Sequence, residues 1–281
     1  MNDIEQNSTE RLIPNEYEKD NKISPNQIIQ KTCCESICCC FFSQNNITIS
    51  EYNSFQQLKK LTSIPYDDKN ESHNKLLEKL REDSERIFKE NQINIDKNIW
   101  RTLGFQNYEN PITDFRGSGV YSITLIDYLL NNYFDQIKDS FNQDFFSFAI
   151  VCIRVLYLLR LFLFLVDSIN NISIEQMSNK VNPCNRKQIK SFCIILLKDN
   201  NIFLEIVSKM IIFVKQKYIK DKNNIKKELN LLIIDPIIYL SLTCIGDALN
   251  NYSNQSRDIM NLLNNEFAKQ MNYNLNKQKL I

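Results

Sequence analysis

Residues Trp100 to Gly119 read WRTLGFQNYENPITDFRGSG and differ in composition from the rest of the chain. The stretch holds the only Trp and three of the four Gly, whereas its surroundings are rich in Ile, Leu, Asn and Lys. Because the 281 residues include only four glycines, the presence of three of them in the stretch that contains Arg116 sets this stretch apart from the rest of the chain. An arginine at a turn with an uncrowded backbone is suited to reach a partner's phosphate group.

Helical patterns lie on both sides of this stretch. From about residue 70 onward, apolar residues recur with a period near 3.6 and charges stand between them. Within the stretch, Pro111 is expected to break any helix. A second helix is expected from about Ser118, and Thr113 and Asp114 are candidate residues to cap its first turn.

Four further helices are expected beyond residue 140. They cover about residues 145–169, 187–218 with a break near 199–201, 231–242 with a kink at its proline, and 257–271. The β-branched run at 231–242 also suits a strand, but no partner strands are evident. The sequence therefore predicts an all-α fold: one helical domain over residues 55–275, preceded by a disordered tail over residues 1–54.

The run FAIVCIRVLYLLRLFLFLV, residues 148–166, has the apolarity of a membrane span. Arg154 and Arg160 interrupt it, and each arginine costs about 2.5–3.5 kcal/mol at a bilayer centre. We therefore expect a buried central helix whose arginines reach a surface or pair with carboxylates.

The charge balance limits the classes of function. Lys and Arg number 34 against 33 Asp and Glu, so no basic field for nucleic-acid binding is expected. The single histidine, His73, is expected at the surface, and no nucleophile–base pair, metal-ligand spacing or glycine-rich nucleotide loop is present. A conventional enzyme, a cofactor and a metal site are therefore not expected.

Five of the nine cysteines fall within eight residues of the sequence CCESICCCFF: Cys33, Cys34, Cys38, Cys39 and Cys40. S-acylation, such as palmitoylation, is the favoured interpretation, because several acyl chains anchor a protein stably to a membrane. A zinc site and a tail without function remain alternatives, although adjacent cysteines rarely converge on one zinc ion. The first thirty residues are polar, so we expect no signal peptide and a cytoplasmic protein. Acylation of the clustered cysteines would make this protein peripherally membrane-associated.

The Trp100 stretch resembles the ELMO domain, specifically the ELMOD type. That family carries Trp, then Gly-Phe-Gln, then Pro, then Thr-Asp-Phe-Arg-Gly-x-Gly. The matching residues here are Trp100, Gly104, Phe105, Gln106, Pro111, Thr113, Asp114, Phe115, Arg116, Gly117 and Gly119. The likeness covers about residues 95–165, and Asn107 and Asn110 depart from the usual pattern.

The resemblance implies an all-α GTPase-activating protein for Arf-like small GTPases, in which Arg116 is the catalytic arginine supplied in trans. ELMO proteins that scaffold Dock-type exchange factors generally lack this arginine and carry armadillo-like and pleckstrin-homology regions, for which we expect no room in 281 residues. A non-catalytic scaffold that binds a small GTPase or a Dock-type exchange factor is the alternative.

From the residues alone, the structural interpretation of Arg116 is favoured: an ion pair with Asp114 or another carboxylate that holds the turn. The family resemblance favours the catalytic interpretation instead. The other matching residues are expected to shape the site or bind the partner. Trp100 and Phe105 are expected as core anchors, and Gln106 is expected to satisfy loop hydrogen bonds; contact with the GTPase is the less favoured alternative for all three. Gly117 and Gly119 are expected to let the backbone approach the nucleotide.

Overall fold

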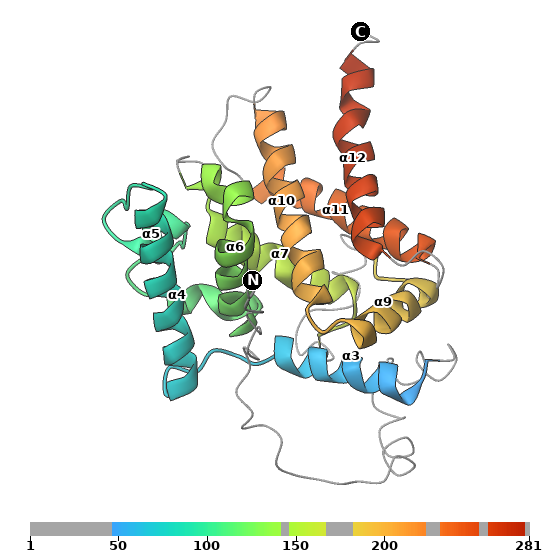
Figure 1. Ribbon diagram of the computed structural model, residues 1–281, viewed down its shortest axis with the longest axis horizontal. Coiled ribbons are helices and arrows are strands. Elements are labelled where there is room, and N and C mark those ends of the chain that lie inside the picture. Colours follow the sequence, from blue (N-terminus) through green and yellow to red (C-terminus); the bar gives the residue numbers. More distant parts are fainter. Residues whose placement is uncertain (1–46, 142–145, 167–181, 223–230, 253–257, 279–281) are drawn as a thin grey trace, which may run out of the picture. The chain divides into compact units, whose positions relative to one another are not determined.

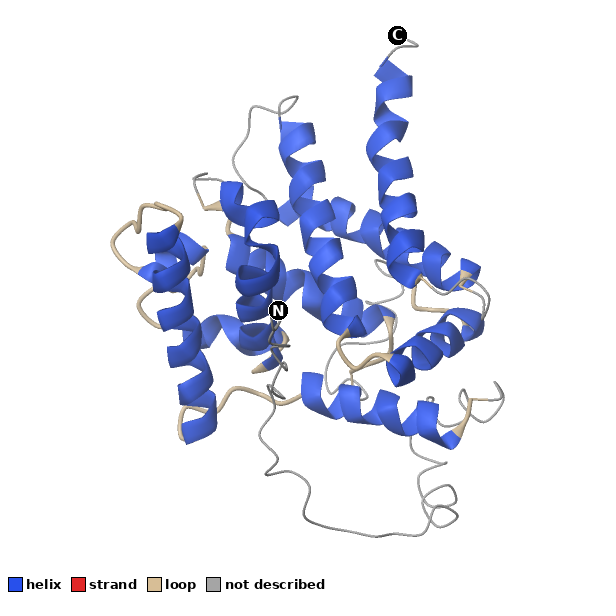
Figure 2. Cartoon of the chain, in the orientation of Figure 1, coloured by secondary structure: helices blue, strands red, loops and turns tan. Residues whose placement is uncertain are grey.

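The computed structural model describes residues 47–141, 146–166, 182–222, 231–252 and 258–278. Within these ranges all regular structure is helical and there is no strand, which confirms the all-α class (Figures 1 and 2). The predicted tail falls mainly on residues 1–46, which lie outside the described ranges together with the five clustered cysteines.

The helices carry the labels of Figure 1. They are α3 (Ile49–Thr62), α4 (Glu71–Glu90), α5 (Ile99–Leu103), the 3-10 helix η2 (Pro111–Gly117), α6 (Tyr121–Ile137), the 3-10 turn η3 (Lys138–Ser140), α7 (Phe148–Phe162), α9 (Arg186–Lys198), α10 (Ile202–Lys222), α11 (Leu231–Asn251) and α12 (Ile259–Gln278).

Several predicted boundaries differ from the observed ones. The helix predicted at 231–242 is observed, but it continues to Asn251. The predicted break near residues 199–201 is confirmed, since α9 ends at Lys198 and α10 begins at Ile202. Helix α3 was not predicted and begins six residues before the expected domain start at residue 55. Its signal is a capping box, in which Thr48 accepts a hydrogen bond from the Glu51 amide and the Glu51 carboxylate accepts one from the Thr48 amide.

Helix α7 is shorter than the apolar run that contains it. It ends in a Schellman motif: the Phe164 amide donates to the Leu161 carbonyl, and the Leu165 amide donates to the Arg160 carbonyl. Phe164 adopts the left-handed conformation, with φ of 58°, that this motif requires. None of the helices in the described ranges is both long enough and apolar enough to cross a bilayer.

Helix α7 lies in the core and contacts η2, α6, α10 and α11. Most of its side chains are buried. Arg154 makes two hydrogen bonds to Asp235 of α11, of 3.1 and 2.8 Å, which confirms the expected carboxylate pairing for this arginine. These bonds to Asp235 are the largest effect on the pKa of the Arg154 guanidinium and raise it.

The scattered cysteines Cys152, Cys184, Cys193 and Cys244 are all buried thiols. Burial raises the pKa of Cys193 and of Cys244 to about 12, so both stay protonated at neutral pH. The expected core role of Cys152, Cys193 and Cys244 is confirmed. The expected surface position of His73 is wrong: it is 6% exposed, because its Nδ1 accepts a hydrogen bond from the Asp67 amide that folds the α3–α4 connection over it.

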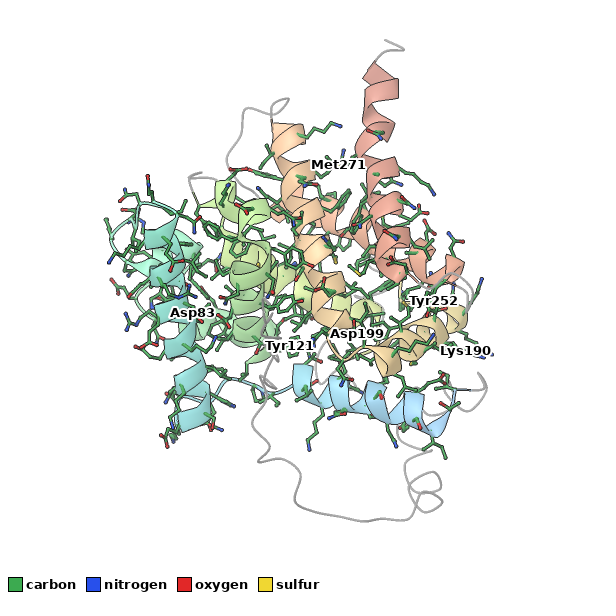
Figure 3. The ribbon with its side chains drawn as sticks, in the orientation of Figure 1. Asp83, Tyr121, Lys190, Asp199, Tyr252 and Met271 are labelled. Atoms are coloured by element: carbon green, nitrogen blue, oxygen red, sulfur yellow. The ribbon has the colours of Figure 1, made fainter. Side chains whose placement is uncertain are left out.

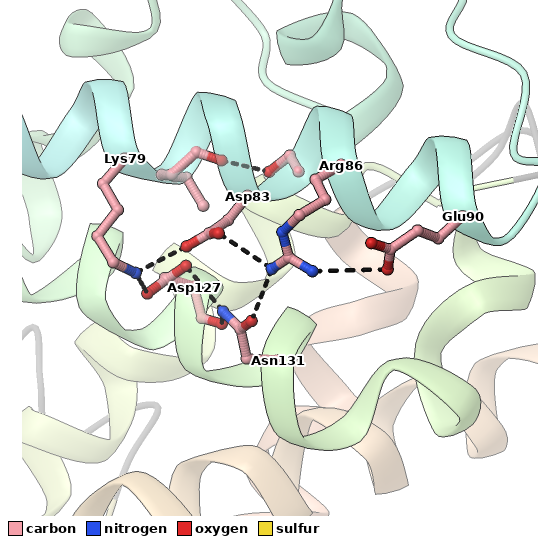
Figure 4. A network of polar contacts seen from close by, with 8 residues as sticks. Lys79, Asp83, Arg86, Glu90, Asp127 and Asn131 are labelled. Carbon is pink, nitrogen blue, oxygen red and sulfur yellow. Dashed lines mark hydrogen bonds and ion pairs between the residues drawn. The ribbon is translucent and has the colours of Figure 1, made fainter. Parts of the chain in front are cut away.

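A polar network fastens α4 to α6 (Figure 4). Lys79 lies 2.7 Å from both Asp83 of its own helix and Asp127 of α6. Asn131 donates to Asp127, and Arg86 pairs with Asp83. Burial is the largest effect on Asp127 and raises its pKa. The helices before and after the Trp100 stretch are therefore tied directly to each other.

A row of aromatic rings joins α3, α9 and α10. The Phe192 ring of α9 meets Phe55 of α3 at 6.4 Å and Phe203 of α10 at 6.3 Å, both edge to face. All three side chains are fully buried. Tyr121, which begins α6 and is labelled in Figure 3, packs against Phe203 at 5.8 Å and extends the row. This row holds α3, and hence the α3–α4 connection, on the rest of the domain.

Removal of the central ring is expected to destabilise the whole domain. Phe192→Ala should lower the free energy of unfolding by about 3–5 kcal/mol, because it leaves a cavity between three helices. Leu197→Ala is the matched control: it lies on the same helix with 45% exposure and should change stability by less than about 0.5 kcal/mol. Urea denaturation of both variants measures the difference, and equal values would contradict this account of the core.

Candidate functional site

The Trp100 stretch folds into α5, a loop and η2, which lead into α6. Helix α5 is capped by Asn98, whose side-chain oxygen accepts a hydrogen bond from the Arg101 amide at 2.9 Å. It ends at Gly104, which is left-handed with φ of 86°. A Cβ there would lie 2.6 Å from the Phe148 nitrogen, so glycine is required for the loop to pack on the start of α7.

Asp114 closes the loop between α5 and η2. Its carboxylate accepts hydrogen bonds from the Gln106 amide at 2.8 Å and the Asn107 amide at 3.2 Å. The prediction that Asp114 caps the next helix is therefore wrong. The reason is that η2 intervenes, so α6 begins only at Tyr121, and its N-cap residue Val120 makes no side-chain capping bond.

Asn107 strengthens the same loop at a position where the sequence departs from the ELMOD pattern. Its side-chain amide donates to the Thr113 hydroxyl at 3.2 Å, and its side-chain oxygen accepts from the Asn110 amide at 3.1 Å. Thr113 is thus the third residue of η2 and does not cap α6. The Gln106 side chain is exposed, and this residue contributes to the loop through its backbone amide.

Three aromatic rings form the base of the loop. Phe105 meets Trp100 at 5.6 Å and Phe115 at 5.7 Å, edge to face in both cases. Phe105 and Phe115 are 5% and 2% exposed, and Trp100 is half-buried. Tyr66 covers Phe115 from the α3–α4 connection at 5.7 Å. Phe105 is thus part of the core, whereas Trp100, also expected there, is only half-buried.

Arg116 is the sixth residue of the seven-residue η2 helix. The expectation of an open turn broken by Pro111 is corrected, because Pro111 occupies the first turn of η2, where the absence of an amide hydrogen costs nothing. The backbone of Arg116 is described by the structure, whereas its side chain lies outside the described part. The preceding residue, Phe115, has a buried side chain, and this burial holds the backbone on the N-terminal side of Arg116 in place.

The chain after Arg116 makes a close contact with the α3–α4 connection. Gly119 is left-handed with φ of 56°, and a Cβ on it would lie 1.9 Å from the Ile64 carbonyl oxygen. The next amide, of Val120, donates to the same oxygen at 3.0 Å. The close approach that Gly119 permits is therefore to the chain itself. Gly117 has ordinary space, since its nearest contact would be Tyr157 at 3.8 Å.

Arg160 of α7 is a residue of this site that the motif did not reveal. It is 5% exposed, so it does not reach the surface. Its guanidinium donates to the Gly117 carbonyl at 3.2 Å and to the Ser63 hydroxyl at 3.1 Å. The neighbouring Ser118 hydroxyl donates to the Ile153 carbonyl of the same helix at 3.2 Å. A charged residue in an otherwise apolar helix was the only sequence signal for this contact.

The motif residues from Trp100 to Gly119 thus come together in one unit. The clustered cysteines Cys33, Cys34, Cys38, Cys39 and Cys40 lie outside the described residues. In the described part of the chain, no group of three or more His, Cys, Asp or Glu side chains is arranged to hold a metal ion. Within this unit, described contacts hold the backbone on both sides of Arg116.

A comparison with protein-family models found that the model of the ELMO/CED-12 family matches residues 56–228, which is more than half of the chain. The matched range holds the second half of α3 and everything from α4 to α10. A search of curated proteins gave no match, and a search of solved structures gave none either.

The contact at Gly119 gives a test of this geometry. Gly119→Ala should lower the free energy of unfolding by at least about 1–2 kcal/mol, the cost of a left-handed residue with a Cβ, and should also displace Ile64. Gly117→Ala is the matched control and should leave stability unchanged or raise it by about 0.4–1 kcal/mol. If thermal denaturation showed the two alanine variants to be equally stable, the described contact with Ile64 would be wrong.

Proposed function

This chain belongs to the ELMO/CED-12 family, and from that premise we propose that it binds a small GTPase and accelerates the hydrolysis of its GTP. The proposed target is an Arf-like GTPase in the GTP-bound state, as the ELMOD-type motif around Arg116 implies. The chain needs no cofactor for this role, because the reacting nucleotide, its Mg²⁺ and the attacking water belong to the GTPase.

The chemistry requires one cation that a small GTPase on its own often lacks. Negative charge spreads over the transferred phosphoryl group and its leaving oxygen in a loose transition state. A guanidinium supplied by a partner stabilises that charge and accelerates hydrolysis by about 10³–10⁵-fold. Arginine suits this role because it is planar, permanently charged and able to donate two parallel hydrogen bonds; lysine matches neither the shape nor the pairing.

The observation that carries the proposal is the support of the backbone on both sides of Arg116. Phe115 is buried before it, and the carbonyl of Gly117 and the amide of Val120 are held after it. Asp114 is engaged by two loop amides. Because the backbone that carries Arg116 is already fixed, little backbone entropy is lost when the side chain enters a nucleotide pocket. The low entropy cost leaves more of the interaction energy to stabilise the transition state.

Arg116 itself is tested by substitution. Arg116→Ala should lower the stimulated rate by about 10³–10⁵-fold, and Arg116→Lys should restore little of it. Single-turnover GTP hydrolysis across a panel of Arf-like GTPases, with the variants beside the wild type, measures the effect. Arg81→Ala is the matched control, since the described ion pairs of Arg81 are with Glu78 and Glu85 of its own helix, and it should keep the wild-type rate.

Two results would contradict the proposal. An Arg116→Ala protein that stimulates hydrolysis fully would exclude the catalytic arginine. A wild-type protein that binds a GTPase without changing its hydrolysis rate would instead support the alternative, a non-catalytic ELMO-type scaffold for a small GTPase or a Dock-type exchange factor.

We further propose that the clustered cysteines carry thioester-linked acyl chains and hold the protein at the cytoplasmic face of a membrane. One chain gives only marginal binding, whereas several anchor stably, and Phe41 and Phe42 add interfacial affinity. Such an anchor would place the domain beside membrane-bound Arf-like GTPases.

Serine substitution tests the anchor. Replacement of all five clustered cysteines by serine should move most of the protein from the membrane fraction to the soluble fraction, because the acyl chains can no longer attach. A variant with Cys152→Ser, Cys193→Ser and Cys244→Ser controls for thiol loss at the buried sites, provided that it folds. Hydroxylamine release and cell fractionation measure the outcome, and unchanged membrane association of the five-serine protein would refute the anchor.

A further inference from the structure

We propose that Arg160 is a positioning residue for Arg116: from the buried side of α7, it holds the end of η2 so that Arg116 is presented in one orientation. This inference rests on the proposed function, because the orientation matters only if Arg116 enters a partner's nucleotide site. Nothing in the motif around Arg116 indicates a residue 44 positions further along the chain.

The guanidinium of Arg160 joins two segments that are distant in sequence. One terminal nitrogen donates to the Gly117 carbonyl, and the other donates to the Ser63 hydroxyl at the end of α3. Ser63 in turn donates to the Leu165 carbonyl at 3.4 Å, just beyond α7. The arginine therefore ties η2 to both the α3–α4 connection and the end of its own helix.

Gly117 is the residue whose conformation most needs this contact. It follows Arg116 directly, and glycine has the widest range of backbone angles of any residue. The space at its Cα is open, with the nearest atom that a Cβ would meet at 3.8 Å, so sterics do not fix it. The bond from Arg160 to its carbonyl supplies the constraint that a side chain would otherwise supply.

The shape of the guanidinium explains why arginine occupies this position. Its planar fork places two donors at a fixed separation, which matches two acceptors on different segments. A lysine ammonium is a point charge on a flexible stem and is less able to hold both acceptors in fixed directions. Because the bond to the Gly117 carbonyl is partly buried, loss of the donor would also leave this carbonyl less well satisfied.

Arg154 provides a matched comparison on the same helix. It stands six residues before Arg160 and binds Asp235 of α11, an element that does not carry the motif. Both arginines interrupt the apolar run of α7, and both make two described hydrogen bonds. They differ in that only Arg160 donates to η2. When both arginines are replaced by lysine, a difference between the two variants therefore reports on η2 and not on the loss of a guanidinium from α7.

The test compares the maximal stimulated rate with the concentration that gives half of it. Single-turnover hydrolysis is measured with increasing amounts of full-length protein, for wild type, Arg160→Gln, Arg160→Lys and Arg154→Lys. Arg160→Gln should lower the maximal rate by at least tenfold and change the half-saturating concentration by less than threefold. Arg160→Lys should recover part of the rate, and Arg154→Lys should keep the wild-type maximal rate.

A second variant covers the case in which Arg160→Gln fails to fold, which circular dichroism would show. Ser63→Ala removes one acceptor of Arg160 and leaves the buried charge in place. It should lower the maximal rate by about 2–10-fold, the effect of one hydrogen bond, without loss of binding.

The outcomes separate this inference from the function on which it rests. Folded Arg160 and Ser63 variants that reach the wild-type maximal rate would overturn the positioning role alone. Arg154→Lys and Arg160→Gln with equal losses of rate and of melting temperature would also overturn it, since both effects would then be general destabilisation. A wild-type protein that stimulates no GTPase would overturn the proposed function and this inference together.

Discussion

The segment that carries Arg116 depends on the close approach of two backbone stretches, at Gly119 and at Ile64. The Ile64 carbonyl oxygen accepts the Val120 amide at 3.0 Å and lies where a Cβ of Gly119 would be. The end of η2 and the start of α6 can sit on the α3–α4 connection only with this glycine in its left-handed conformation. The short backbone path from Phe115 to Val120 is thereby fixed at its far end.

Other contacts secure the remainder of that path. Phe115 is enclosed by Phe105 and Tyr66, and Asp114 binds the preceding loop through two amides. Arg160 of α7 donates a hydrogen bond to the Gly117 carbonyl. These contacts come from three segments, namely the α5–η2 loop, the α3–α4 connection and α7, so no single helix supports η2. The core helix α7 and the aromatic row through Phe192 in turn hold those segments in place.

Part of this arrangement follows from local sequence rules. Periodicity identified the all-α class, and the apolar run at residues 148–166 indicated that α7 is buried. The break between α9 and α10 was also predicted. Periodicity missed α3, whose buried positions include polar Lys59 and Thr62 and whose clearest signal is its capping box. The role of Asp114 was misjudged because the capping rule assumed that a helix starts near Ser118. The bond from Arg160 to Gly117 spans 43 residues, and local patterns do not encode such contacts.

The central claim is that Arg116 contributes in the transition state of GTP hydrolysis and little before it. The most direct measurement is the affinity of the protein for an Arf-like GTPase loaded with GDP and aluminium fluoride, which mimics that transition state, compared with the GTPase loaded with a non-hydrolysable GTP analogue. The account predicts that the wild type binds the mimic at least about a hundredfold more tightly and that Arg116→Ala loses this preference. Equal affinity of the wild type for both states would contradict it.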